Sequence, residues 1–148
     1  MIKTFRGILG DGKEARIRLS TKQGKIGYKI VKFDLIPGKP GGDDSEFVGK
    51  IYKVPDQPAN ATIDFSDGNL LAAGYINNHT GASYYNLATI IVFDQEVFNQ
   101  DIYVTMNDGQ GADNECNYYV ELETFSMTDN AAAVSTLRDI RLNPQVGA

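Results

Sequence analysis

The sequence contains very little of the residue types that build disulfide frameworks, zinc sites and catalytic dyads. Among its 148 residues there is one Cys and one His, and Trp is absent. A disulfide framework needs pairs of Cys, and a zinc site needs several Cys or His ligands. No run of about 18 apolar residues, the length that crosses a bilayer as a helix, occurs either. We therefore expect neither a disulfide-stapled domain, nor a zinc domain, nor a membrane-spanning helix.

Positive charge is also scarce. The chain has 14 Lys and Arg against 19 Asp and Glu, which gives a net charge of −5 and an isoelectric point near 4.8. Binding to nucleic acid or to an anionic membrane surface depends on clustered Lys and Arg, so we expect neither partner. The length lies close to the roughly 150 residues of an ordinary domain. We predict a single domain over residues 1–148 with its own apolar core.

The dominant pattern in the chain is an alternation of polar and apolar residues with a period of two. This pattern is typical of half-buried strands, because successive side chains point to opposite faces of a sheet. In residues 28–36 it places Val31, Phe33 and Leu35 on one face, and in residues 117–124 it places Tyr118 and its alternate neighbours inward. The expected strands cover residues 2–9, 14–19, 28–36, 47–54, 61–65, 70–76, 87–93, 101–106 and 117–124.

Turn signals separate these segments every 8 to 12 residues or so, which favours an all-β antiparallel sandwich or barrel. Asp67-Gly68 lies between residues 61–65 and 70–76 and predicts a hairpin there. Residues 87–93 are almost continuously apolar, which predicts a central strand covered on both faces. Residues 1–9 are expected to form either an edge strand or an extended arm.

The C-terminal part of the chain departs from the strand pattern. Thr128-Asp129-Asn130 offers side-chain oxygens that cap a helix N-terminus, and Pro144 marks its limit. We predict a short helix over residues 129–141 followed by a tail at 143–148. So short a helix needs a docking surface, either the β core of its own chain or a neighbouring subunit. Its apolar stripe consists of Ala131, Val134, Leu137 and Ile140.

No group of residues predicts catalysis. His79 lies among turn residues, and no Gly-x-Ser-x-Gly nucleophile elbow occurs, so a loop histidine is favoured over a catalytic one. Cys116 is in phase with Tyr118, which favours a buried thiol over a nucleophile. We therefore expect no enzyme activity and no cofactor, and a carboxylate-dependent hydrolase is the alternative. Within residues 108–115, Asp108, Asp113 and Glu115 are only weak candidates for a cation site, because the EF-hand spacing fails there.

Several runs resemble a known family of particle proteins. They include IRLSTKQGKIGYKIVKF at 17–33, IYKVP at 51–55, FDQEVFNQDIYVT at 93–105, CNYYVELE at 116–123 and TLRDIR at 136–141. From about residue 15 to residue 142 the chain resembles small virion structural proteins of marine tailed bacteriophages. The resemblance implies a non-enzymatic protein of the particle, located in the capsid, the neck or the tail. Together with the absence of a catalytic group, it leads us to expect a jelly-roll-like β-sandwich that carries the predicted C-terminal helix. We expect this sandwich to decorate or cement the capsid at the virion surface, with the major capsid protein as partner and as a homo-oligomer.

Such a protein binds its neighbours through edge strands and aromatic loops. Tyr suits wet interfaces because it presents apolar area with a polar tip. The interface residues expected on this basis are Ile2, Phe5, His79, Tyr84 and Tyr85. Two other functions remain open, namely a tail- or fibre-associated β domain and a carbohydrate-binding module assisted by calcium.

Overall fold

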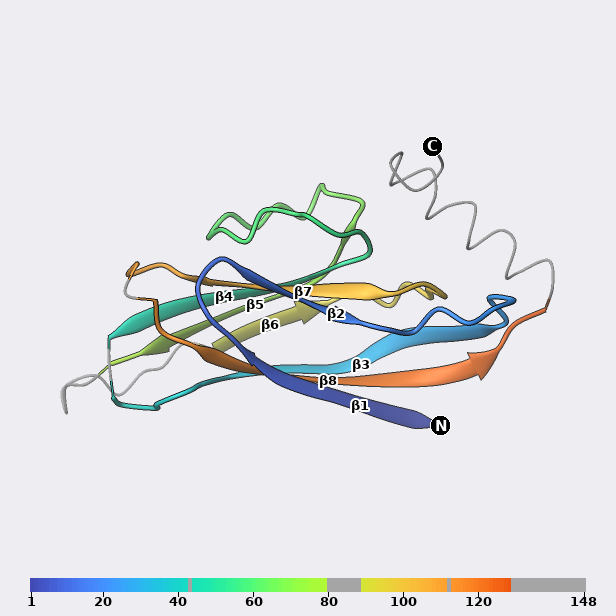
Figure 1. Ribbon diagram of the computed structural model, residues 1–148, viewed down its shortest axis with the longest axis horizontal. Coiled ribbons are helices and arrows are strands. Elements are labelled where there is room, and N and C mark those ends of the chain that lie inside the picture. The colour runs from blue at the N-terminus through green and yellow to red at the C-terminus, as the bar shows by residue number, and fades with distance from the viewer. Residues whose placement is uncertain (43, 80–88, 112, 129–148) are drawn as a thin grey trace.

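The computed structural model describes residues 1–42, 44–79, 89–111 and 113–128. This part of the chain is all-β, with eight strands in two antiparallel sheets and no helix, and hence no helix able to cross a membrane. Figure 1 shows the two sheets as two layers. The strands are β1 (Ile2–Leu9), β2 (Lys13–Ile17), β3 (Ile26–Pro37), β4 (Ser45–Tyr52), β5 (Leu70–Asn78), β6 (Thr89–Phe93), β7 (Ile102–Asp108) and β8 (Cys116–Ser126).

The first four strands alternate between the two layers. The smaller sheet has the order β1-β8-β3, and the larger sheet has the order β2-β7-β4-β5-β6. Strands from opposite ends of the chain are therefore neighbours: β1 pairs with β8, β2 with β7, and β4 with β5. β1 is paired along its whole length, so residues 2–9 form an edge strand and not an arm.

One apolar core lies between the sheets, and the period-two pattern predicts most of it. In β8, Val120 and Leu122 are fully buried, and Tyr118 is nearly so. In β7, Ile102, Val104 and Met106 are all 0% exposed. Packing of these inward-facing side chains between the two sheets removes apolar area from water, and this burial is the main stabilising contribution in such a fold.

The predicted phase of β3 is wrong at one residue. The register with β8 shifts between Ile30 and Lys32, so that Val31 has no place in the inward row. A bulge of this kind puts two residues opposite one and exchanges the faces of the strand on either side of it. The side chains that β3 contributes to the buried core are therefore those of Tyr28, Ile30, Phe33 and Leu35.

The hairpin predicted around Asp67-Gly68 does not form. Residues 53–69 instead cross the outer face of the larger sheet without making a strand, as the green loop above that sheet shows in Figure 1. Lys50, which is 1% exposed, projects from β4 under this segment and donates to the carbonyls of Pro58 and Thr62. Turns closed by the side chains of Asp64 and Asp67 then return the chain to β5. Tertiary anchoring overrides the local turn signal here.

The strand predicted at 87–93 is also placed differently from the expectation. β6 lies at the edge of the larger sheet and is not a covered central strand. Its outer side chains Ile90 and Val92 are 60% and 47% exposed. A continuous apolar run indicates burial on both faces, but nothing in the described part of the chain covers this one. The predicted helix at 129–141, the tail at 143–148 and residues 87–88 lie outside the described residues.

Candidate functional site

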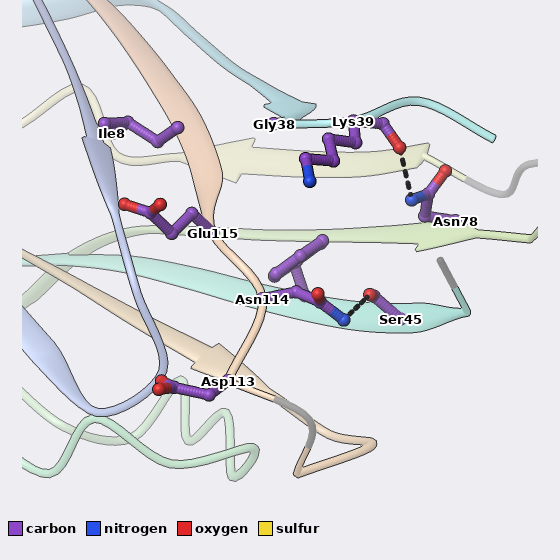
Figure 2. A pocket seen from close by; sticks show the side chains of 9 residues that line it. Ile8, Gly38, Lys39, Ser45, Asn78, Asp113, Asn114 and Glu115 are labelled. Carbon is purple, nitrogen blue, oxygen red and sulfur yellow. Dashed lines mark hydrogen bonds between the residues drawn. The ribbon is translucent and has the colours of Figure 1, made fainter. Parts of the chain in front are cut away.

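A pocket of about 300 Å³ lies between the two sheets at one end of the molecule. Three parts of the chain meet there, namely the segment after β3, the end of β5 and the segment before β8. Figure 2 shows side chains from all three around the opening. Its lining residues are Ile8, Gly38, Lys39, Ser45, Phe47, Asn78, Asp113, Asn114 and Glu115.

Two asparagines hold the walls of this pocket. The buried Asn78 side chain donates to the Lys39 carbonyl at 3.0 Å and accepts from the Gly41 N–H at 2.8 Å. Asn114 donates to the Ser45 hydroxyl at 2.8 Å. Dashed lines in Figure 2 mark this hydrogen bond and the one from Asn78 to the Lys39 carbonyl. Because each amide bridges two segments, the walls are held by hydrogen bonds that do not involve a ligand.

The open groups of the pocket are charged or amide groups. Lys39, Asp113 and Glu115 are exposed, whereas Phe47 is 1% exposed and closes the inner end. The Ser45 hydroxyl is buried and already accepts from Asn114. This arrangement suits a small polar ligand held by hydrogen bonds and charge, and it does not pair a nucleophile with a base.

The three acidic residues singled out in 108–115 do not act together. Asp108 is 2% exposed, and its carboxylate accepts from the N–H groups of Gln110 at 3.0 Å and Asn114 at 3.2 Å. It therefore closes the turn after β7, while Asp113 and Glu115 face the pocket. Among the described residues no group of three Asp, Glu, His or Cys is placed to hold a metal ion.

The remaining candidate residues that the structure describes lie in β1 and directly after β5. His79 directly follows β5, and its Nδ1 is 3.8 Å from the Asp44 carboxylate. Ile2 is 51% exposed at the N-terminal end of β1, whereas Phe5 of the same strand is partly buried and packs against the core. Tyr84 and Tyr85 lie outside the described residues.

Cys116 is unsuited to nucleophilic chemistry. Its thiol is fully buried at the start of β8, as the strand phase predicts. Burial raises its pKa to about 12 although a backbone hydrogen bond from Ile36 acts in the opposite direction. Because the thiolate is the reacting species, a thiol with this pKa is inert near neutral pH.

Sequence reasoning identified the two acids of the pocket and missed the side chains that shape it. Lys39, Asn78 and Asn114 come from three segments that are distant in the chain. The signal that was present is compositional, since residues 37–45 and 107–115 are both rich in Gly, Asn and Asp. Comparisons of the chain with protein-family models, curated proteins and solved structures found no match.

Proposed function

We propose that this chain is a non-enzymatic structural protein of a phage virion that decorates the capsid by binding the major capsid protein. The resemblance of residues 17–33 and 93–105 to small virion proteins supports this function. The all-β architecture in two antiparallel sheets is compatible with it. The protein then acts at the particle surface, as a homo-oligomer.

The strand pairing is the structural observation that supports the proposal most. A jelly roll arises when a long hairpin rolls up, so that the first strand pairs with the last, the second with the next to last, and the middle two with each other. β1 pairs with β8, β2 with β7, and β4 with β5 in this way. Jelly rolls recur in viral capsid and lectin domains. We therefore propose a jelly-roll-like sandwich in which β6 has joined β5 instead of β3, with the C-terminal helix at 129–141 added to it.

The use of the reactive side chains supports a structural role as well. The Cys116 thiol is buried with a pKa of about 12. Asp108 is buried, and its carboxylate accepts hydrogen bonds from backbone N–H groups of its own turn. Residues of this kind stabilise a scaffold, whereas a reactive cysteine is partly exposed and has a lowered pKa.

Binding to undecorated phage shells tests the proposed function. The purified full chain should bind shells saturably and with a fixed stoichiometry, and should be found by mass spectrometry in purified particles. Ile2→Lys, on an exposed residue of β1, should weaken binding by about tenfold or more. Ile63→Lys, on the segment that crosses the other sheet, is the matched control. Failure of the wild-type chain to bind shells would overturn the decoration role, and labelling of intact virions would reveal a tail or fibre position.

The pocket favours a second candidate function, a carbohydrate-binding module. Its amides, carboxylates and Lys39 amine are the groups that recognise a small polar ligand. A glycan array with and without a chelator tests this function and the participation of calcium. Loss of a glycan signal in Lys39→Ala but not in Lys22→Ala would place the ligand in the pocket.

A further inference from the structure

β6 differs from the other sheet edges in carrying no charge. The edge strands of the two sheets are β1 and β3 in the smaller sheet and β2 and β6 in the larger one. Charged side chains on an edge oppose pairing with another chain. Among these four described strands, β6, with the sequence Thr-Ile-Ile-Val-Phe, is the one without a charged residue. The other edges carry Lys3 and Arg6 in β1, Lys13, Glu14 and Arg16 in β2, and Lys29, Lys32 and Asp34 in β3.

The backbone of β6 presents a regular set of groups away from β5. The N–H of Asp94, just past the strand, donates to the Leu71 carbonyl at 2.8 Å and so points toward β5. In an antiparallel ladder the N–H and C=O of one residue point to the same side, and this side alternates along the strand. The groups of Ile90 and Val92 therefore face β5, and those of Thr89, Ile91 and Phe93 face outward.

The outer face of β6 is apolar. Ile90 and Val92 are 60% and 47% exposed, and Phe65 of the crossing segment is 70% exposed. Phe65 and Val92 line the same hollow of about 240 Å³, together with Leu70. Contiguous exposed apolar surface of this kind marks an interaction site more often than scattered exposed residues do.

We propose that β6 pairs in antiparallel fashion with β6 of a second copy of this chain, about a two-fold axis that passes midway between the two Ile91 residues. This register brings each Ile91 opposite its counterpart and each Thr89 opposite the other copy's Phe93. All the outward N–H and C=O groups of these residues then find partners, because such opposed residues exchange both hydrogen bonds. The larger sheets of the two copies become one continuous sheet.

A second copy fits this edge because the strand is complementary to itself. The net charge of −5 makes two copies repel one another in general, but β6 adds no charge to the contact. In the proposed register Ile90 lies opposite Val92 of the other copy on the outer face. A two-fold contact of this kind is closed, so it ends at a dimer and does not continue into a fibre. The inference deepens the homo-oligomeric state of the proposed function by naming the surface that pairs. It does not depend on capsid binding, since the free protein should dimerise in solution.

Analytical ultracentrifugation of the full chain over a range of concentrations tests the pairing. The wild-type chain should form a dimer, and Ile90→Lys should raise the dissociation constant by about tenfold or more. Ile36→Lys is the matched control, because Ile36 is 58% exposed on the smaller sheet and should leave the dimer unchanged. Circular dichroism establishes that both variants remain folded. A wild-type chain that stays monomeric, as it would if another part of its own chain covered β6, overturns the proposal.

A charge-pair experiment tests the register itself. Ile90→Lys and Val92→Glu should each weaken the homodimer, because each places an unpaired charge in an apolar contact. A mixture of the two variants should recover heterodimers, since the introduced charges lie opposite one another in the Ile91-centred register. Absence of recovery overturns this register. No shells enter these measurements, so their failure is distinguishable from failure of the capsid-binding role.

Discussion

Two buried charged residues in this molecule are stabilised in very different ways. Asp101 directly precedes β7 and is 7% exposed. It accepts hydrogen bonds from the N–H groups of Leu19 at 2.7 Å and Ser20 at 2.8 Å, and from the Arg16 guanidinium at 2.7 Å. Lys50, 1% exposed beneath residues 53–69, donates to the Pro58 and Thr62 carbonyls at 3.1 and 2.8 Å and to the Asn60 side chain at 3.2 Å. Asp101 has an opposite charge as partner, and Lys50 has neutral oxygens.

Both residues have a lowered pKa, but the lowering has opposite consequences. Burial by itself raises the pKa of Asp101, yet the N–H groups of Ser20 and Leu19 and the Arg16 guanidinium override it and bring the value down to about 2. Burial lowers the pKa of Lys50, and the charge of Asp67 offsets only part of this effect. The fold therefore favours the charged form of Asp101 and disfavours the charged form of Lys50. A buried charge contributes stability only where its partners replace the lost water.

Removing the charge of Asp101 should have the largest effect. Asp101→Asn keeps the shape, and its amide oxygen can still accept from the N–H groups of Leu19 and Ser20. The negative charge is lost, however, and an amide NH2 group replaces the oxygen that accepts from the Arg16 guanidinium. We therefore expect a loss of about 3 kcal/mol in the free energy of unfolding. Urea titration measures this loss. Asp94→Asn is the matched control, because Asp94 is exposed and its bond from the Glu96 N–H can be kept by an amide oxygen. Equal stability of the two variants would contradict the comparison.

The same carboxylate should contribute to acid sensitivity. Since its pKa falls from 3.8 to about 2 on folding, Asp101 stabilises the protein above pH 3.8, and this contribution disappears as the pH falls through 2. The difference in unfolding free energy between the wild-type chain and Asp101→Asn should thus shrink by about 2 kcal/mol between pH 5 and pH 2. Urea titrations at several pH values measure the difference. A difference independent of pH would show that the charge is not what stabilises this region.

Loss of the cation beside Asp101 should cost less than loss of the carboxylate. In Arg16→Met the two backbone N–H groups still hold Asp101, and the Arg16 side chain is half exposed. We expect less than half of the destabilisation caused by Asp101→Asn, because exposed ion pairs are weak. Thermal unfolding of Arg16→Met beside Arg18→Met, an exposed arginine of similar position, measures it. A loss equal to that of Asp101→Asn would assign the stabilisation to the ion pair.

Replacement of Lys50 should have the smallest effect of all. Lys50→Met fills nearly the same space without a charge, and its three former acceptors belong to an exposed segment that water can reach. We expect a change within about 1 kcal/mol, whereas Lys50→Ala, which also empties the space, should lose about 2 kcal/mol or more. Because the folded pKa of Lys50 lies below 10.5, the wild-type chain should gain stability relative to Lys50→Met as the pH rises toward 10.5. A loss in Lys50→Met as large as that of Asp101→Asn would refute the contrast.

The strands with strict alternation were predictable to within about two residues. Residues 14–19 correspond to Lys13–Ile17, and residues 117–124 correspond to Cys116–Ser126. Alternation is a local property that matches the pleat of a strand directly. The segment 61–65 was mispredicted because the side chain of Lys50, which belongs to β4, donates to the Thr62 carbonyl and anchors the segment as a loop. Asp113 and Glu115 of the pocket were recognised as acids, but their neighbours Lys39 and Asn78 were not, since no local pattern relates residues brought together by three connections.

By itself the sequence determined that the part of the chain described by the structure is all-β, which side chains of a strictly alternating strand such as β8 face inward, and that the single thiol is buried. These properties follow from side-chain periodicity, which each strand carries independently of the others. Only the tertiary structure decided which strands are neighbours, where the bulge at Ile30 and Lys32 exchanges the faces of β3, and which apolar strand is left at an edge. Those features depend on hydrogen bonds and packing between segments that are distant along the chain, and such contacts leave no periodic trace in the residues that make them.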